Sequence, residues 1–283
     1  MEYVRLNNGL QMPAEGLGTF LLSPDEAEES VLAALKDGYR LIDTANAYMN
    51  ERGVGRGIKR SGVKREDIFL VTKLWPTEYE DGMKAIDATL ERLGTDYIDL
   101  LILHQPVGNY LAAYATMEEA YKAGKIKAMG LSNFPEELVE EVVDKAETAP
   151  QIVQVEAHPY FPQTELKKLL AKHGMALMAW YPLGHGDKTL IKQQVFSDLA
   201  AKYGKTNAQI ILRWHVQSGH VVIPGSKNPE HIRSNFDIFD FALTEDEMAR
   251  IAKLDKNKRY YNMSLKDAAK AYLSLALDFD AQK

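Results

Sequence analysis

Short apolar runs and longer amphipathic stretches alternate along the whole chain. The apolar runs are four to seven residues long and often β-branched, and they lie at 16–20, 40–43, 68–73, 97–103, 126–131, 152–156, 175–180 and 220–224. The stretches between them repeat with the period of a helix, over about ten residues or more. Short strands that alternate with helices in this way predict βα units and a parallel sheet.

The start and end signals of helices support this alternation. In residues 23–38, Ser23 precedes Pro24 and acidic residues follow, which is typical of a helix N-terminus, and Gly38 marks the end. Residues 81–94 close in the same way, with an apolar turn and then a glycine. We therefore expect a helix in each of these two stretches.

The number of units bears on the choice between two architectures. Eight apolar runs and eight helical stretches in 283 residues favour a (β/α)8 barrel, the TIM barrel, over a doubly wound open sheet, which stays the alternative. Residues 2–14 precede the first barrel strand, and the turn dipeptide Asn8-Gly9 predicts a β-hairpin that caps the bottom of the barrel. Because no linker or low-complexity segment interrupts the chain, residues 1–283 are predicted to form a single domain.

Composition argues against several classes of function. Hydrophobic residues make up 46% and charged residues 26% of the chain, the balance of a globular protein with a sizeable core. A net charge of -6 without a basic stripe argues against a nucleic-acid partner. No apolar run is long enough to cross a bilayer, and the N-terminal residues lack a signal-peptide pattern. With the absence of cysteine, these features predict a cytoplasmic protein and no membrane partner.

Polar residues that follow the apolar runs are expected to meet at one rim, because the carboxyl ends of barrel strands face the same side. Asp43 ends the second run, and Tyr48 follows in the next loop. Lys73 ends the third run, and His104 follows the fourth. Each residue alone has an ordinary explanation, such as a structural ion pair, a core histidine or a loop aromatic. Together, an acid, a phenol, a cation and an imidazole are the parts of a proton-transfer site.

Tests for other common sites are negative. Gly16 and Gly18 lack the third glycine of a Rossmann fingerprint, and the residue five positions before Gly204 is not the glycine of a P-loop. No HExxH motif, Cys/His cluster or close run of carboxylates indicates a metal site. A nucleotide would therefore have to bind in another way.

Eight short motifs, in order along the chain, resemble a known family. They are GLGTF, GYRLIDTANAY, VTKLW, LLILHQP, GLSNF, QVEAHPY, WYPLG and IPGSKNPEHIRSNF. Over residues 3–255 the chain resembles the aldo-keto reductase superfamily, above all the bacterial branch that includes 2,5-diketo-D-gluconate reductases. The resemblance implies a βα barrel that binds a nicotinamide dinucleotide without a Rossmann fold and reduces aldehydes and ketones to alcohols. It also implies a small carbonyl substrate and a monomer.

The same resemblance implies a catalytic tetrad formed by Asp43, Tyr48, Lys73 and His104. Carbonyl reduction delivers a hydride to carbon and a proton to oxygen, but a free tyrosine, with a pKa of about 10, is a slow acid at neutral pH. We expect the Lys73 ammonium to lower the pKa of the proton donor Tyr48, while Asp43 keeps Lys73 charged. His104 is expected to orient the substrate oxygen.

Cofactor and substrate contacts are also implied by the resemblance. The nicotinamide carboxamide is expected on Ser132, Asn133 and Gln154, with the Trp180 ring stacked beneath the nicotinamide. The full set of expected cofactor contacts is Thr19, Asp43, Ser132, Asn133, Gln154, Trp180, Ser226, Lys227, His231 and Asn235. The expected substrate contacts are Phe20, Trp75, His104, Gln105 and Tyr181. Residues 184–194 and a helical segment at 260–279 are expected to cover the site.

Three departures from the family pattern concern specificity. Gly225 stands where a lysine is frequent, and His231 stands where an arginine is usual, so recognition of a 2′-phosphate is weakened. Because Ser226, Lys227 and Arg233 can compensate, NADP(H) stays favoured and NAD(H) stays open. Gln105 replaces a frequent tryptophan and can admit more polar substrates.

Two other functions stay open from the sequence. A lysine at a barrel strand end can form a Schiff base as in a lyase, although Asp43 would hold Lys73 charged and an imine-forming amine must be neutral. A redox-sensing partner subunit that keeps a nucleotide site is the non-enzymatic alternative, and the intact tetrad argues against it.

Overall fold

The structure, a computed structural model, describes residues 1–282. Its centre is an eight-stranded sheet in which all neighbouring strands are parallel, in the order β10-β9-β8-β7-β6-β5-β4-β3. These strands are β3 (Leu17–Gly18), β4 (Leu41–Asp43), β5 (Phe69–Leu74), β6 (Leu100–Leu103), β7 (Met129–Ser132), β8 (Ile152–Glu156), β9 (Ala176–Trp180) and β10 (His220–Val222). Two further strands, β1 (Tyr3–Arg5) and β2 (Gln11–Pro13), form a separate antiparallel pair.

All eight predicted barrel strands are present, although several are shorter than the apolar runs. The run at 97–103 gives a strand only from Leu100, because Ile98 pairs with Ile126 in an isolated bridge that is not continued. The run at 126–131 starts as a strand only at Met129 for the same reason. An apolar run therefore marks burial, whereas the strand itself needs a continuous ladder of hydrogen bonds.

The sheet closes on itself. Glu15, which lies just before β3, forms a parallel bridge to Val222 in β10. A second parallel bridge joins Gly18, in β3, to Gly225, which follows β10. A Cβ atom on Gly18 would lie 2.8 Å from the carbonyl oxygen of Ile223, and one on Gly225 would lie 3.0 Å from that of Gly18. Only glycine allows backbones to approach this closely. The predicted (β/α)8 barrel is confirmed, and the open sheet is excluded.

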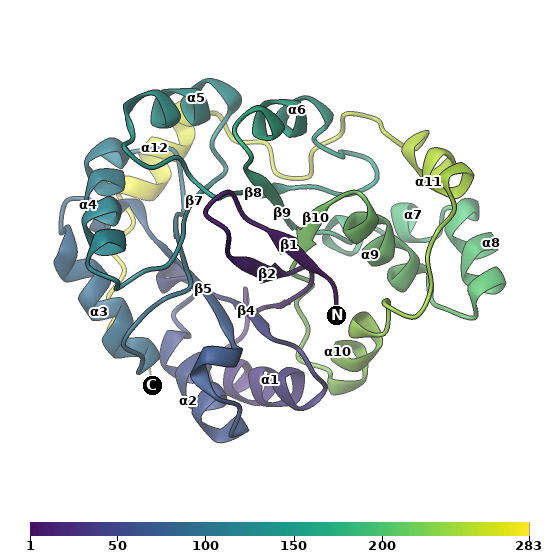
Figure 1. Cartoon of the computed structure of the whole chain (residues 1–283), viewed down its shortest axis with the longest axis horizontal. Helices are drawn as coiled ribbons and strands as arrows, with labels where there is room; N and C mark the ends of the chain where they lie inside the picture. Colours follow the sequence, from purple (N-terminus) through teal and green to yellow (C-terminus); the bar gives the residue numbers. More distant parts are fainter. Residues whose placement is uncertain (283) are drawn as a thin grey trace.

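Helices surround the ring of strands (Figure 1). They are α1 (Pro24–Lys36), α2 (Glu51–Ser61), α3 (Met83–Leu93), α4 (Tyr110–Lys122), α5 (Glu136–Lys145), α6 (Thr164–Lys172), α7 (Lys188–Ile191), α8 (Gln194–Tyr203), α9 (Asn207–Gln217), α10 (Pro229–Phe236), α11 (Glu245–Ala252) and α12 (Leu265–Leu273). Ser23 caps α1 through a capping box with Glu26, and Gly94 ends α3 with left-handed backbone, both as predicted. None of these helices has the length and apolar character needed to cross a membrane.

The N-terminal hairpin closes one end of the barrel. In Figure 1 it lies, in dark purple, across the centre of the ring. Leu6 and Met12 belong to the apolar cluster that the inward-facing strand residues form inside the barrel. The Asn7 amide donates to the carbonyl oxygen of Pro150, in the loop before β8, at 3.0 Å. Because this loop precedes a strand, the hairpin caps the N-terminal end of the barrel, as predicted, and leaves the C-terminal end for a site.

The C-terminal segment covers the opposite end. Helix α12 packs against residues 76–78, which follow β5, and Trp75 Nε1 donates to the Tyr272 carbonyl oxygen at 3.3 Å. The prediction of a helix throughout 260–279 is wrong at both ends, because only 265–273 is helical. Ser264 caps the first turn of α12, and the residues before it are held by contacts with the barrel.

A buried carboxyl group on the segment that leads into β3 has no partner. The Glu15 side chain is completely buried, and neither oxygen has a hydrogen-bond partner. Burial raises the pKa of Glu15 well above its usual value. The Glu15 carboxyl therefore keeps its proton in the folded protein at pH values where an unfolded chain has lost it, that is, above the ordinary glutamate pKa of about 4.3.

This difference predicts how stability depends on pH. Stabilisation by the bound proton is complete below the unfolded pKa and is lost as pH rises toward the raised folded pKa, so the free energy of unfolding falls above about pH 4.3. Glu15→Gln should remove this fall, so the stability of the variant relative to the parent should be greater at pH 8 than at pH 5. Urea unfolding at pH 5 and pH 8 measures the free energy of unfolding of parent and variant, and Glu91→Gln, at an exposed position, is the control. A parallel pH dependence in parent and Glu15→Gln would contradict the prediction.

Candidate active site

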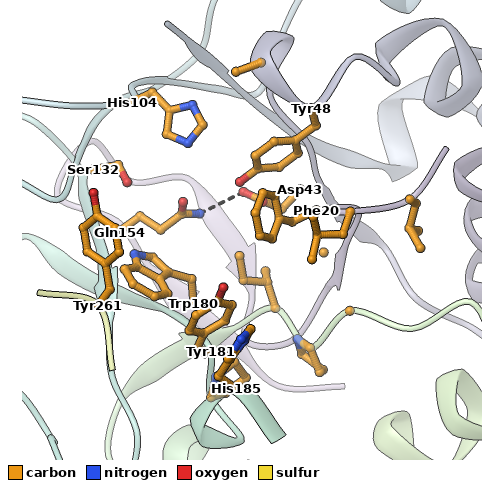
Figure 2. Close-up of a pocket in the computed structure, with 18 of the residues that line it drawn as sticks. Phe20, Asp43, Tyr48, His104, Ser132, Gln154, Trp180, Tyr181, His185 and Tyr261 are labelled. Carbon is orange, nitrogen blue, oxygen red and sulfur yellow. Dashed lines mark hydrogen bonds between the residues drawn. The ribbon is translucent and has the colours of Figure 1, made fainter. Parts of the chain in front are cut away.

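A cavity of about 790 Å³ opens at the C-terminal end of the barrel. The predicted site residues that line it are Phe20, Asp43, Tyr48, Trp75, His104, Gln105, Ser132, Asn133, Gln154, Trp180, Tyr181, Ser226 and Lys227. They come from strand ends and loops all around the barrel, so the fold collects residues that are far apart in sequence at one rim. Figure 2 shows Tyr48 and Asp43 on one side of this cavity, with Trp180, Tyr181 and Tyr261 across from them.

Lys73 lies behind the cavity wall and connects the polar residues at its base. Its side chain is completely buried, and Nζ lies 2.6 Å from Asp43 Oδ1. The same ammonium donates to the carbonyl oxygen of Thr44 at 2.8 Å and to the Tyr48 hydroxyl at 3.3 Å. The second oxygen of Asp43 accepts a hydrogen bond from Gln154 Nε2 at 2.8 Å, drawn as a dashed line in Figure 2. All three donor positions of the ammonium therefore have acceptors, which is what a buried charge requires.

His104 stands at the edge of this group as an uncharged ring. Its ring is edge-on to Tyr48, with 5.6 Å between ring centroids, and to Trp75, with 5.1 Å. Burial, and secondly the positive charge of Lys73, hold the pKa of His104 well below its usual value. Its Nδ1 atom is buried without a hydrogen-bond partner. An imidazole that is neutral at pH 7 is suited to hydrogen bonding and has no extra proton to give up.

The pKa of Tyr48 shifts in the direction opposite to the one predicted. Burial, and then the negative charge of Asp43, raise the pKa of Tyr48 well above its usual value. The expected lowering of the Tyr48 pKa by Lys73 is overcome mainly by burial, and Asp43, which lies closer to the ammonium than the phenol does, offsets its charge. The phenol is therefore protonated throughout the neutral range.

Comparison with known proteins places the chain in a family. The sequence model of the aldo/keto reductase family matches residues 15–256. The chain belongs to this family. Methylglyoxal reductase DkgA of Escherichia coli (strain K12) is 43% identical over 259 residues, covering 90% of this chain and 94% of that protein. Glyoxal reductase of Bacillus subtilis (strain 168) is 45% identical over 260 residues, with the same coverage.

A solved relative contains a cofactor. The crystal structure of a Bombyx mori aldo-keto reductase in complex with NADP superposes with a TM-score of 0.87 at 33% identity, covering 92% of this chain and 95% of that one. The resemblance stated from the motifs is thus confirmed at the level of the family and of the fold.

Two of the polar residues expected to hold the nicotinamide in this aldo/keto reductase, Asn133 and Gln154, are already held by side-chain hydrogen bonds to other residues of the site. Asn133 Oδ1 accepts from Trp180 Nε1 at 3.0 Å, and Asn133 Nδ2 donates to the His104 carbonyl oxygen at 3.3 Å. Gln154 donates to Asp43. Ser132 also lines the cavity. These contacts fix the orientation of the amides at the wall of the cavity.

The cavity fits a nicotinamide dinucleotide. Its volume lies within the range of about 300–1,000 Å³ that is usual for ligand sites, and it extends from Tyr48 to Lys227. Amide groups that both donate and accept stand beside the Trp180 ring, a combination suited to an aromatic carboxamide. Gly18 and Gly225 line the cavity where it continues toward Lys227. This aldo/keto reductase therefore has the groups and the space for such a cofactor.

Three residues predicted to contact the cofactor do not line the cavity. Thr19 is completely buried, and its hydroxyl donates to the Asp43 carbonyl oxygen at 3.0 Å, so it supports Asp43 from below. His231 is exposed on α10, and Asn235 is buried on the same helix. The wall reaches only to Lys227 on this side.

The two cations near the predicted adenosine end are paired with carboxylates. Lys227 Nζ lies 2.8 Å from Glu26 Oε1, and Arg233 Nε lies 3.4 Å from Asp37 Oδ1. Both pairs are exposed, so each is weak and can rearrange. Glu26 and Asp37 were not foreseen from the sequence, because the ends of α1 lie about two hundred residues from α10.

The covers of the cavity were predicted as segments but not as residues. The loop after β9 contributes His185, whose ring stacks on Tyr181 with 4.3 Å between centroids. The C-terminal segment contributes Tyr261, Tyr272 and Leu275. The aromatic and apolar residues of this segment indicate in the sequence that it packs against something. Which residues they pack against depends on long-range contacts that the sequence does not show.

Proposed function

We propose that this protein reduces aldehydes and ketones to alcohols with a reduced nicotinamide dinucleotide, NADPH in preference to NADH. The observation that carries the proposal is the chain of contacts from Asp43 through the Lys73 ammonium to a protonated Tyr48 at the cavity. When bound, the cofactor supplies a hydride to the carbonyl carbon. Relatives named methylglyoxal reductase and glyoxal reductase support small carbonyl compounds as substrates.

The protein's part in the reaction is the delivery of a proton. As negative charge develops on the substrate oxygen, Tyr48 gives its hydroxyl proton to that oxygen and becomes a phenolate. Lys73, which already donates to the phenol oxygen at 3.3 Å, stabilises this phenolate because the bond becomes charge-assisted. The raised pKa of Tyr48 does not block the step, because an alkoxide is a stronger base than a phenolate. The ammonium thus acts on the phenolate as it forms rather than by making the resting phenol acidic.

The remaining residues position the reactants. His104, which is uncharged, is assigned the hydrogen bond that orients the substrate oxygen, and this leaves Tyr48 as the proton donor. Ser132, Asn133 and Gln154 are assigned to the nicotinamide carboxamide, and Trp180 to the ring face opposite the substrate. Phe20, Trp75, Gln105 and Tyr181 form the walls available to the substrate.

A panel of carbonyl compounds tests the function. Aldehydes, α-dicarbonyls and keto-sugars are supplied with NADPH or NADH, and loss of the reduced-nicotinamide absorbance is followed. We expect turnover with aldehydes or α-dicarbonyls and a larger kcat/KM with NADPH. Absence of turnover while NADPH still binds would favour a sensing subunit. Trapping of substrate on Lys73 by borohydride would favour a Schiff-base lyase.

The Glu26–Lys227 pair yields a prediction on cofactor preference. Glu26→Gln frees Lys227 for a 2′-phosphate, so affinity for NADPH should rise about two- to fivefold, matching the strength of an exposed ion pair. Affinity for NADH, which lacks that phosphate, should not change. Quenching of tryptophan fluorescence gives both dissociation constants, and Glu29→Gln on the same helix is the control for net charge. An equal change for the two cofactors would contradict the prediction.

A further inference from the structure

A second buried carboxylate stands at the C-terminal end of β8, outside the tetrad. Glu156 is 4% exposed, and its two oxygens accept the backbone N–H groups of Tyr260 at 2.6 Å and Tyr261 at 2.9 Å. His158 Nε2 lies 3.0 Å from the same oxygen that Tyr260 contacts. Burial opposes the charge, but the hydrogen bonds from His158 and from the two backbone groups hold the pKa of Glu156 below its usual value. The group is therefore an anion above mildly acidic pH.

These hydrogen bonds fasten the C-terminal segment to the rim of the barrel. The N–H groups of Lys256 and Lys258 donate to the Tyr160 carbonyl oxygen, both at 3.1 Å. The Tyr260 hydroxyl donates to Asp187 Oδ2 at 2.6 Å, in the loop after β9. The segment 256–261 is thus held by two neighbouring loops and by Glu156, whose carboxylate makes charge-assisted contacts to its backbone.

Tyr261, which this tether holds, forms the wall that faces the tetrad. In Figure 2 its ring lies on the same side of the cavity as Trp180, across from Tyr48. Its ring centroid is 6.0 Å from that of Trp180, and its hydroxyl contacts the hydroxyl of Tyr272. The Tyr272 ring in turn packs edge-on against Trp75, with 4.8 Å between centroids. One continuous aromatic wall therefore depends on the position of the segment that Glu156 holds.

We propose that Glu156 is a positioning residue that sets selectivity for large carbonyl substrates by fixing Tyr261 at the cavity wall. The proposal rests on the carbonyl reduction proposed above. An aromatic aldehyde at Tyr48 extends further across the cavity than a two-carbon or three-carbon substrate, so we expect the far wall to affect the larger substrate more. Without the carboxylate, two backbone N–H groups lose their acceptor, which costs enough to displace the segment. Binding of large substrates then weakens, and binding of small ones and of cofactor does not.

The experiment compares substrates of two sizes in matched variants. In Glu156→Ala, KM for 2-naphthaldehyde should rise about tenfold or more, the equivalent of a lost charged hydrogen bond of about 1.5–3 kcal/mol. KM for methylglyoxal and the dissociation constant for NADPH should stay unchanged. Glu156→Gln, which keeps the shape and one acceptor, should give a smaller effect. Glu165→Gln, an exposed glutamate on α6, is the control.

A double variant tests whether Glu156 acts through Tyr261. Tyr261→Ala should show the same selective loss, and Glu156→Ala/Tyr261→Ala should be no worse than the more affected single variant. Additive effects, or equal losses for both substrates, would overturn the proposal.

A readout that does not use turnover separates this proposal from the proposed function. Amide hydrogen exchange of Tyr260 and Tyr261 should be slow in the parent and faster in Glu156→Gln, with exchange in the β6 and β7 amides unchanged. Unchanged exchange at Tyr260 and Tyr261 would refute the tether even in an active enzyme. Accelerated exchange in a protein that reduces no carbonyl compound would keep the tether and reject the function.

Discussion

Tyr48→Phe lowers kcat/KM for carbonyl reduction by about 10²–10⁴-fold, the contribution usual for a general acid, while NADPH binds with nearly the same dissociation constant. The ring of Tyr48 packs against Phe20, with 5.0 Å between centroids, and phenylalanine preserves this packing. Only the hydroxyl that Lys73 contacts is lost. No other group takes over, because His104 is uncharged and Lys73 lies behind the wall.

Steady-state kinetics with one aldehyde and fluorescence titration with NADPH measure the two effects separately. Tyr121→Phe on α4 is the control. Because the pKa of Tyr48 is raised by burial and by Asp43, the parent enzyme should keep its kcat for reduction as pH rises through neutrality to about pH 9, still below the ordinary phenol pKa of about 10. Retention of most activity in Tyr48→Phe, or a loss of kcat near neutral pH, would show that another group supplies the proton.

Lys73→Met destabilises the protein by about 3–5 kcal/mol, the cost usual when one partner of a buried ion pair is removed. Asp43, which is only 1% exposed, then loses the ammonium that lies 2.6 Å from its Oδ1 atom in the parent. Asp43→Asn should be similarly destabilising because it leaves the ammonium unpaired. Asp43→Asn/Lys73→Met removes both charges and should recover most of the lost stability, without recovering activity.

Urea unfolding of the four proteins forms a double-mutant cycle, and the aldehyde assay is run on each. Lys122→Met, which breaks the exposed pair with Glu147, should cost at most about 1 kcal/mol. If the double variant were as unstable as the sum of the single variants, Asp43 and Lys73 would not be acting as a pair. If it regained activity, Tyr48 would not need the ammonium.

Local rules were sufficient to predict the barrel and much of the rim. The start of α1 could be read from Ser23 because a capping box is confined to four residues. The approach of Lys73 to Asp43 followed from parallel neighbours, since both stand at the carboxyl ends of adjacent strands. Periodicity and strand order thus place residues well.

The features that the sequence did not predict depend on opposing electrostatic effects and on contacts between residues far apart in the chain. The pKa of Tyr48 is decided by burial and by the relative distances of Asp43 and Lys73, which no pattern of residues contains. Thr19 lies between Gly18 and Phe20, which both line the cavity, yet its own side chain does not line it because its hydroxyl donates to the Asp43 carbonyl oxygen. Tyr260 and Tyr261 lie outside α12, and the acceptor of their N–H groups, Glu156, stands about a hundred residues earlier in the chain.

The hairpin plug has a consequence for the order of assembly during synthesis. Residues 1–13 leave the ribosome before the barrel strands, but Asn7 cannot reach its acceptor until the chain has been made beyond Pro150. Until then Leu6 and Met12 have no closed interior to enter. The hairpin, although made before the barrel strands, is therefore among the last parts of the barrel to dock, and its apolar residues stay available to chaperones while the strands up to β7 are being made.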